Sequence, residues 1–344
     1  MIKHKHNGNI KNGNQWHKPI EEVFTGIDLR GIKVNCPQCK EMGLVTTRWI
    51  KGPTLKPIYI LHIKWGKARK ICQLNEEQSK GVRNRVRILQ SDIKKLLKSK
   101  KAFVLFSGGK DSIATLMYLK SIAKTVKSDL TAIYVDTTAG LPANTRYVKK
   151  VCKYLGINLE IVRPKIDYFT LAKEWGIPSF KYRWCCRELK IRPIEEYLDK
   201  IEKPKVVFDG IRAVESNIRK HYIPIWYHPS FKCLSVSPIF YWSDEQVISY
   251  VNSNGIPKTF LHSLGTSTEC WCGAYKTKSD FEKLYELDKD MFNRLIEVEK
   301  ENKSGYTFIY NNGQRIPLKE LAKAIEKEDK NNANERKSKM QNGG

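Results

Sequence analysis

The sequence predicts an α/β fold, a doubly wound parallel sheet with helices on both faces. Three observations lead to this fold class. From residue 102 onward, short apolar runs typical of buried strands alternate with amphipathic helical patterns. A glycine-rich turn, residues 106–112, joins the first run to the helix that follows it. Polar residues directly follow the later runs, as they do where ligands bind at the carboxyl ends of parallel strands.

The alternation can be followed along the chain. The expected strands are residues 102–106, 131–135, 158–162 and 205–208, and the expected helices among them are residues 112–124 and 144–155. Asp136 and Thr137 follow the second of these strands, and Gly210 and Arg212 follow the last. We therefore expect these residues near the glycine-rich turn, at one edge of the sheet.

The glycine-rich turn has the features of a phosphate-binding loop. Gly108 and Gly109 allow a tight turn that brings backbone N–H groups close to an anion, and the next helix adds its positive N-terminal end. Ser107 and Ser112 add hydroxyl groups, and Lys110 adds a charge. The turn is not a Walker A loop, which requires Ser or Thr directly after the lysine. The alternative is an ordinary glycine-rich connection between a strand and a helix.

The charge of the chain indicates a polyanionic partner. The formal net charge is +26 over 344 residues, and residues 1–75 alone carry 14 Lys and Arg against 4 Asp and Glu, a net of +10. We expect contact with nucleic acid; the alternative is a lysine-rich solvated surface. No apolar run approaches the ~20 residues of a membrane span, so we expect a soluble cytoplasmic protein without a membrane partner.

The chain divides into five expected parts. They are a basic flexible arm (1–30), a zinc-ribbon-like module (31–75), a connecting amphipathic helix (76–100), the α/β domain (101–302) and a basic tail (303–344). Apolar residues at helical spacing over 279–302 predict that the α/β domain ends in a helical, cysteine-bearing region packed on the core. From Glu326 onward the composition predicts disorder.

The nine cysteines suggest metal binding before disulfides, because most of them occur as close pairs in a chain expected to be intracellular. Cys36 and Cys39 form a Cys-x-x-Cys knuckle, and His62 and Cys72 lie on likely strands after it. These four residues are the expected ligands of a tetrahedral zinc ion. The alternative is a knuckle without metal. Cys152 fits a buried structural cysteine.

The motifs of the α/β domain occur in an order that resembles a known family. Ser107 to Ser112 resemble the PP-loop of ATP pyrophosphatases, which cleave ATP between its α and β phosphates. Asp136-Thr137, Arg183-Trp184-Cys185-Cys186, Gly210-Ile211-Arg212 with Arg219, and Cys270-Trp271-Cys272 follow. Over about residues 102–290 this set resembles the phosphoadenosine phosphosulfate (PAPS) reductase family, part of the PP-loop or adenine nucleotide alpha-hydrolase superfamily.

The resemblance implies roles for particular residues. The nucleotide would be bound by Ser107, Gly108, Gly109, Lys110, Asp111, Ser112, Asp136, Thr137 and Gly210, with Asp111 helping to hold Mg. The anionic substrate would be bound by Arg183, Arg187, Arg212 and Arg219. The catalytic residues would be Lys110, Asp111, Asp136 and Arg212.

The resemblance also implies a 4Fe-4S cluster on Cys185, Cys186, Cys270 and Cys272. The second pair departs from the family pattern, because it is Cys-x-Cys in place of Cys-x-x-Cys. Cys233 is therefore a candidate substitute for one ligand. Three thiolates would leave one iron open, as in some tRNA-thiolating PP-loop enzymes, where that iron carries an extra sulfide.

Two further departures bear on the reaction. Reductases of this family use a mobile C-terminal cysteine as nucleophile, and no cysteine follows Cys272. The loop is intact, whereas reductases often carry degraded versions. We therefore expect cleavage of ATP to AMP and pyrophosphate during sulfur transfer to a nucleic acid, either tRNA or DNA, with a sulfur donor or reductant protein. The alternatives are a PAPS or adenylyl-sulfate reductase that uses an external thiol to release sulfite, and a non-catalytic nucleotide-sensing module that binds nucleic acid.

Overall fold

The computed structural model describes residues 33–47, 58–64, 67–85, 88–202, 204–311 and 314–341. The expected basic arm, residues 1–30, lies outside this part of the chain. Two compact units divide the chain: the first comprises residues 1–135, 147–162 and 191–258, and the second comprises residues 136–146, 163–190 and 259–344. No helix among the described residues is both long enough and apolar enough to span a membrane.

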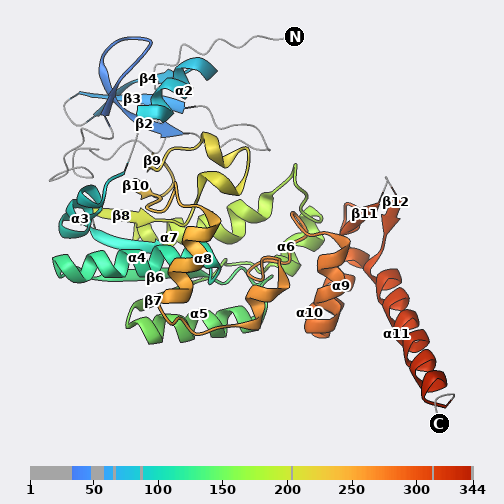
Figure 1. Ribbon diagram of the computed structural model, residues 1–344. Helices are drawn as coiled ribbons and strands as arrows, with labels where there is room; N and C mark the ends of the chain where they lie inside the picture. Colours follow the sequence, from blue (N-terminus) through green and yellow to red (C-terminus); the bar gives the residue numbers. More distant parts are fainter. Residues whose placement is uncertain are drawn as a thin grey trace, which may run out of the picture. The chain divides into compact units, whose positions relative to one another are not determined.

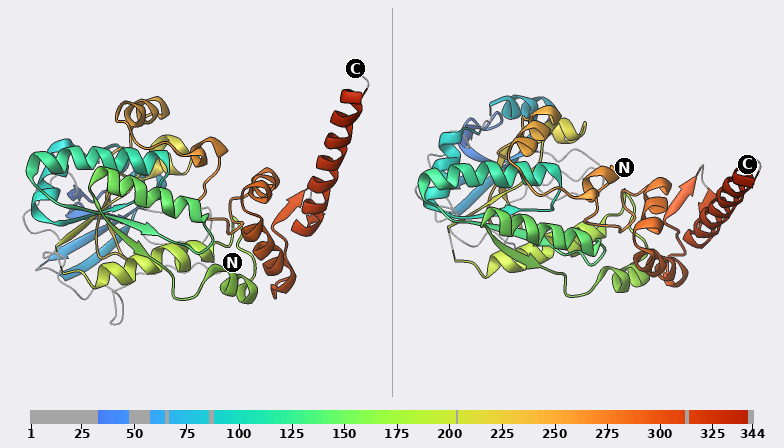
Figure 2. Two further views of the ribbon diagram at one scale, coloured as in Figure 1. Left: turned by 90° about the horizontal axis from the view of Figure 1, so that it is seen from below. Right: turned by 60° about the horizontal axis from the view of Figure 1, so that its bottom comes forward.

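The first unit is built on a mixed sheet whose central strands are parallel. In spatial order the sheet runs β4-β3-β2-β9-β10-β8-β5-β6-β7, with β1 beside β2 (Figure 1). The parallel strands are β5 (Lys101–Leu105), β6 (Leu130–Val135), β7 (Asn158–Val162), β8 (Lys205–Phe208) and β10 (Cys233–Val236). Helix α4 (Lys110–Val126) lies on one face and α7 (Arg192–Asp199) on the other (Figure 2). The predicted doubly wound α/β sheet is confirmed.

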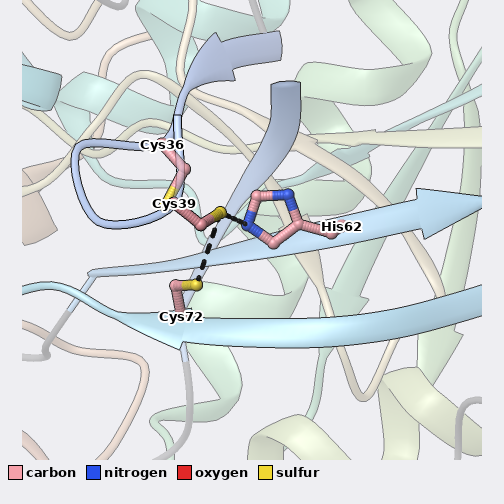
Figure 3. A group of neighbouring side chains, drawn as sticks. All are labelled: Cys36, Cys39, His62 and Cys72. Atoms are coloured by element: carbon pink, nitrogen blue, oxygen red, sulfur yellow. Dashed lines mark hydrogen bonds between the residues drawn. The ribbon is translucent and has the colours of Figure 1, made fainter. Parts of the chain in front are cut away.

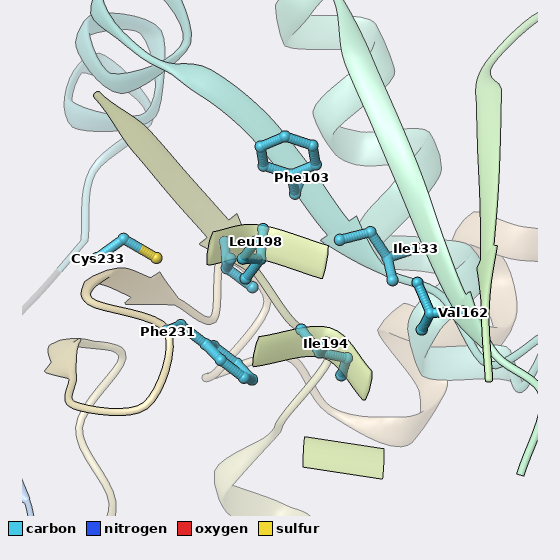
Figure 4. Packing of buried hydrophobic residues seen from close by; sticks show 8 residues of the cluster. Phe103, Ile133, Val162, Ile194, Leu198, Phe231 and Cys233 are labelled. Atoms are coloured by element: carbon cyan, nitrogen blue, oxygen red, sulfur yellow. The ribbon is translucent and has the colours of Figure 1, made fainter. Parts of the chain in front are cut away.

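The core of the first unit fills both faces of this sheet. Successive residues of a strand point to opposite faces, so Phe103 points one way and its buried neighbours Ala102 and Val104 point the other. On the Phe103 face, Ile194 and Leu198 of α7 pack into one apolar cluster (Figure 4). The cluster contains Phe103, Ile133, Val162, Ile194, Leu198, Val207, Phe231 and Cys233.

The strands expected to form a separate ribbon extend this central sheet. They are β1 (Lys33–Asn35), β2 (Met42–Thr47), β3 (Ile58–Lys64) and β4 (Lys67–Gln73), which pair with one another antiparallel. Strand β2 then pairs in parallel with β9 (Ile225–His228), where Thr46 lies opposite Tyr227. Because β9 also pairs with β10, the Cys/His segment shares one sheet with the parallel strands.

The prediction of a single helix over residues 76–100 is wrong. The structure has two helices, α2 (Glu76–Arg85) and α3 (Gln90–Ser99), separated by an extended Leu89. Asp92 favours a new helix start at Gln90, because its carboxylate accepts a hydrogen bond from the Leu89 N–H at 3.0 Å. Leu89, an apolar residue at this break, is exposed.

The second unit holds the C-terminal helices. The helical pattern of residues 279–302 forms two helices, α9 (Lys278–Leu287) and α10 (Lys289–Glu301), because Asp288 accepts the Met291 N–H and starts the second. The expected disorder from Glu326 is not observed, since α11 continues to Gln341. The Tyr285 hydroxyl donates to Glu326 at 2.7 Å, which ties α11 to α9.

The remaining elements connect these parts. They are α5 (Pro142–Leu155), α6 (Tyr168–Trp175), the π-helical turn η2 (Cys186–Ile191), the short turns η3 (Ala213–Glu215), η4 (Arg219–His221) and η5 (Phe260–Leu264), helix α8 (Asp244–Ser253), and the hairpin of β11 (Ile309–Asn311) and β12 (Gln314–Ile316).

Candidate nucleotide site and cysteine centres

The glycine-rich loop forms a cradle between β5 and α4. Gly108 has a φ of 85°, which a residue with a side chain rarely adopts, and α4 begins two residues later at Lys110. The Ser107 hydroxyl accepts the Gly109 N–H at 3.3 Å and lies 3.2 Å from the Ser112 hydroxyl. The first turn of α4 therefore presents its backbone N–H groups and two hydroxyls at one place, an arrangement suited to phosphate oxygens.

Gly210 lies directly against the first turn of α4. A Cβ atom at this position would stand 3.1 Å from the carbonyl carbon and oxygen of Asp111 and from the Ser112 nitrogen. A Cβ at Gly109 would meet only the Ser107 hydroxyl, at 3.5 Å, which is an ordinary contact. The loop after β8 and the loop after β5 thus come together as expected, and the close approach depends on the missing side chain of Gly210.

Arg212 joins this loop to α4 and α8. Its guanidinium donates from Nε to Asp111 at 2.7 Å and from Nη2 to Asp244 at 2.8 Å, and only 1% of its side chain is exposed. Lys110 Nζ donates to the same Asp244 oxygen at 2.6 Å. The hydrogen bond from Lys110, followed by that from Arg212, lowers the pKa of Asp244 to about 2. An incoming polyphosphate would compete with the two carboxylates for these cations.

Asp244 belongs to the candidate site through its contacts with Lys110 and Arg212, but the sequence does not predict it. Ser243 caps α8 by accepting the Gln246 N–H, so the sequence signals the start of a helix here. Nothing in that local pattern indicates a partner 134 residues earlier in the chain. Only the fold brings Asp244 to Lys110.

Asp209 fixes the turn that carries Gly210 and Arg212. Its buried carboxylate accepts hydrogen bonds from Ser235 at 3.0 Å, from Ser237 at 2.5 Å and from the Ile211 N–H at 3.1 Å. Burial raises the pKa of Asp209, and these hydrogen bonds oppose that rise. Arg219 lies one short turn away and pairs with Glu215, whose other oxygen accepts the Arg212 N–H.

Asp136 and Thr137 follow β6 in the second unit. Asp136 pairs with Arg163 at 2.7 Å and accepts the Thr138 N–H at 3.0 Å. Thr137 is buried and donates its hydroxyl to the Glu269 carbonyl at 2.9 Å. The sequence predicts Asp136 and Thr137 as candidate site residues, but it gives no signal for Arg163, which has no motif around it.

Four cysteines gather in the second unit. The sulfurs of Cys185 and Cys272 lie 3.4 Å apart, so the two cysteine pairs meet through these residues. Hydrogen bonding to Cys272, with burial, holds the pKa of Cys270 well above its usual value. Cysteine thiolates are the usual ligands of iron-sulfur clusters, and the contact between Cys185 and Cys272 brings one residue of each pair together.

The surroundings of these thiols are charged and ordered. Lys190 forms an ion pair with Glu269, the residue before Cys270. The hydrogen bond from Cys185 lowers the pKa of Cys186 against the effect of burial, and the Lys190 cation adds to the lowering. Arg187 lies in η2 next to Cys186. Cys233 has a different environment, because it is fully buried in the apolar cluster around Phe103, as is typical of a structural cysteine.

The Cys/His group of the first unit forms a second candidate metal centre. The ligand atoms of Cys36, Cys39, His62 and Cys72 all lie within 4.8 Å of one another (Figure 3). Cys39 Sγ is 3.3 Å from His62 Nε2 and 3.9 Å from Cys72 Sγ. A tetrahedral zinc ion with Zn–S bonds of about 2.3 Å separates its sulfurs by about 3.8 Å. The four residues predicted from the knuckle are therefore brought together with spacings that suit zinc.

Comparison with known proteins identifies the family. Residues 101–283, just over half of the 344 residues, match the model of the phosphoadenosine phosphosulfate reductase domain. The chain belongs to the phosphoadenosine phosphosulfate reductase family. The matched segment contains the PP-loop, Arg212, Asp244 and the four cysteines of the second unit, whereas the Cys/His centre lies outside it.

Relatives within this family extend the likeness. Two uncharacterized proteins of Methanocaldococcus jannaschii are similar to this chain: one is 31% identical over 57% of the chain, and the other is 30% identical over 62% of it. The matched part covers 46% of the length of each relative, so this chain spans about half of their length. The adenosine 5'-phosphosulfate reductase of Staphylococcus epidermidis is 25% identical over 43% of this chain and 61% of its own.

Two solved structures are similar to part of this chain. A phosphoadenylyl-sulfate reductase from Candida auris has a TM-score of 0.42 at 19% identity, covering 58% of this chain and 96% of its own. The U34-tRNA thiolase NcsA from Methanococcus maripaludis, with its [4Fe-4S] cluster, has a TM-score of 0.33 at 17% identity, covering 63% of this chain and 81% of its own.

The two glycines of the PAPS reductase-family site should respond differently to substitution. Gly210→Ala should lower the free energy of unfolding by about 1–3 kcal/mol, because the new methyl group presses on rigid backbone atoms. Gly109→Ala is the matched control and should change it by less than ~0.5 kcal/mol. Chemical denaturation of both variants measures this, and equal stability of the two would contradict the close approach.

Proposed function

We propose that this protein binds ATP at the PP-loop and cleaves it to AMP and pyrophosphate while transferring sulfur to a nucleic acid. The observation that carries the proposal is the intact loop, where the Ser107 and Ser112 hydroxyls and the first turn of α4 converge beside Gly210. Membership of the family supports an adenine nucleotide as the ligand.

The proposed reaction has two steps. An oxygen of the acceptor attacks the α phosphorus of ATP, the bond to the bridging oxygen breaks, and pyrophosphate leaves with the electron pair. Hydrosulfide supplied by a donor protein then attacks the carbon or phosphorus atom that carries the adenylylated oxygen. The bond between that atom and the oxygen breaks, and AMP leaves with the oxygen. Lys110 and the N–H groups of α4 would stabilise the charge that builds on pyrophosphate. Mg, with Asp111 among its ligands, would neutralise part of the phosphate charge.

The charge of the chain supports a nucleic acid as the acceptor. A net charge of +26 favours a polyanionic partner, and +10 of it lies in the first 75 residues. We infer tRNA or DNA as the acceptor class. Arg183, Arg187 and Arg219 remain proposed contacts for anionic groups of the substrate, and Arg212 remains a proposed catalytic residue that acts while holding Asp111 and Asp244.

The four cysteines of the second unit are proposed to hold a 4Fe-4S cluster. When bound, such a cluster supplies iron that can carry sulfur or electrons. The cluster would be held by Cys185, Cys186, Cys270 and Cys272. Lys190 would place a positive charge beside it. Tyr168 would fix the backbone of the Cys270/Cys272 pair, because its hydroxyl donates to the Cys272 carbonyl at 3.1 Å.

A second candidate function is reduction of an adenylyl sulfate. It is favoured by the match to the PAPS reductase domain and by the similarity to adenosine 5'-phosphosulfate reductases. In that reaction an external thiolate would attack the sulfate sulfur and AMP would leave. A second thiol would then form a disulfide with the first and release sulfite. In this alternative the thiol comes from a partner protein or a small molecule.

Replacement of Lys110 tests the first function. Lys110→Ala should lower pyrophosphate release from ATP, measured with nucleic acid present, by a factor of ~100 to 1000 with a smaller effect on ATP binding, because it removes one donor preorganised toward the leaving group. Lys124→Ala, an exposed lysine of the same helix, is the control. Wild-type protein that forms no AMP from ATP yet releases sulfite from adenylyl sulfate would establish the reductase instead.

The cluster can be tested by metal analysis. Anaerobically purified protein should be coloured and contain about four iron atoms per chain. Cys272→Ser should lose most of the iron, whereas Cys152→Ser, which alters a buried cysteine of α5, should retain it. Colourless wild-type protein that contains zinc but no iron would show that the four cysteines hold a different metal.

We also propose that Cys36, Cys39, His62 and Cys72 hold one zinc ion. Cys72→Ser should remove about one equivalent of zinc, measured by mass spectrometry, and should lower thermal stability because metal binding contributes to folding. Cys152→Ser again serves as the control. A Cys72→Ser protein that keeps its full zinc content would rule out this ligand set.

A further inference from the structure

A group of exposed aromatic side chains surrounds Arg183 in the second unit. The rings of Phe180 and Tyr275 are 46% and 56% exposed, and Tyr182 beside them is 47% exposed. Large rings on a surface commonly mark a site of interaction. We call Phe180, Arg183 and Tyr275 the aromatic platform.

The platform is held in place by tight local structure. Ser179 and Tyr182 exchange backbone hydrogen bonds, both at 3.1 Å, so that Phe180 and Lys181 stand at the tip of a closed turn. The Tyr182 N–H also lies 3.1 Å from the Ser179 hydroxyl oxygen. These hydrogen bonds fix the backbone of the turn, and an ordered backbone has less entropy to lose on binding.

Arg183 is ordered between the two rings. Its guanidinium carbon lies 5.7 Å from the centre of the Phe180 ring and 5.5 Å from that of Tyr275. It also donates a hydrogen bond to the Tyr275 hydroxyl. The two rings meet edge to face at 5.6 Å. A guanidinium and two rings locked in this way combine aromatic faces with a fixed positive charge.

The platform is attached to both cysteine pairs. Arg183 precedes Cys185 by two residues, and Tyr275 follows Cys272 by three. Since Cys185 and Cys272 lie 3.4 Å apart, a ligand on the platform would be placed next to the thiols. The same two segments that supply the sulfurs thus supply the aromatic surface.

The positive charge of the segment around the aromatic platform favours an anionic partner. Residues 173–190 contain five Lys and Arg, Lys173, Lys181, Arg183, Arg187 and Lys190, against Glu174 and Glu188, a net of +3. Aromatic rings with an interleaved arginine on a positive surface are typical of proteins that bind single-stranded nucleic acid, where bases stack on the rings. A paired base has both faces covered by its neighbours, so only an unpaired nucleotide could use this surface.

We propose that Phe180, Arg183 and Tyr275 bind an unpaired nucleotide of the nucleic-acid acceptor and place it beside the cysteine pairs of the second unit. This inference rests on the proposed function and adds to it that the substrate is a single-stranded or looped region. The base stacks on an aromatic face, and Arg183 faces the adjoining phosphate or the base itself.

The test is binding of fluorescein-labelled oligonucleotides to the full-length, anaerobically purified protein, followed by anisotropy. The probes are a single-stranded RNA of mixed sequence and the same RNA in a perfect duplex. Phe180→Ala and Tyr275→Ala should each weaken binding of the single strand by roughly 5- to 150-fold, as expected for loss of one stacked base. Duplex binding should not change.

Further variants separate stacking from charge and from folding. Phe180→Leu keeps an apolar side chain of similar bulk but has no ring, so it should weaken binding of the single strand like Phe180→Ala. Phe180→Trp keeps an aromatic ring and should bind the single strand about as tightly as wild type. The salt dependence of binding should stay the same in all of them, because no phosphate-binding charge is removed. Tyr154→Ala and Tyr241→Ala, exposed tyrosines of the first unit at 57% and 50%, are the controls and should bind normally.

Several outcomes would overturn the inference. If the Phe180 and Tyr275 variants keep their iron and bind the single strand as tightly as wild type, the platform does not stack bases, even where ATP turnover with nucleic acid still supports the proposed function. If they bind RNA normally but use a dithiol reductant protein poorly in sulfite release, the platform is a protein-docking surface. Wild-type protein that cleaves ATP but binds no single strand would also overturn it.

Discussion

The buried guanidinium of Arg212 is the contact on which the candidate nucleotide site depends. It holds Asp111 at the start of α4 and Asp244 at the start of α8, while its own backbone follows β8. A buried charge is costly unless it is fully paired, and Arg212 has two carboxylates and the Trp242 carbonyl as partners. Three segments that are distant in sequence are therefore fixed around one side chain. The end of the PP-loop at Asp111 is held by Arg212, a residue that lies outside the loop.

Much of this arrangement could be predicted from the sequence, because it follows from local patterns. Alternating apolar runs and helical periodicity gave the α/β class, and the glycine-rich turn marked the place where β5 meets α4. The Cys/His centre was also predictable, since a Cys-x-x-Cys knuckle leaves only a few nearby residues able to complete a tetrahedral site. His62 and Cys72 then come together because β3 and β4 are neighbouring strands.

What could not be predicted depends on partners far away in the chain or on competing local hydrogen bonds. Asp244 looks like an ordinary residue at a helix start, and only the folded chain brings Lys110 and Arg212 to it. The breaks at Leu89 and Asp288 come from single carboxylates, Asp92 and Asp288, that accept backbone N–H groups in the middle of good helical periodicity. Apolar spacing cannot detect such an interruption, because the pattern continues through it.

The parallel pairing of β2 with β9 has a consequence for the edge of the sheet. Strand β9 is covered on one side by β10 and on the other by β2, at Thr46 and Tyr227. A chain shortened to begin at Glu76 would lack β1 to β4 and would leave the backbone N–H and C=O groups of β9 open on that side. Unpaired strand edges recruit other chains. The Cys/His segment thus covers β9 and moves this edge of the sheet out to β4.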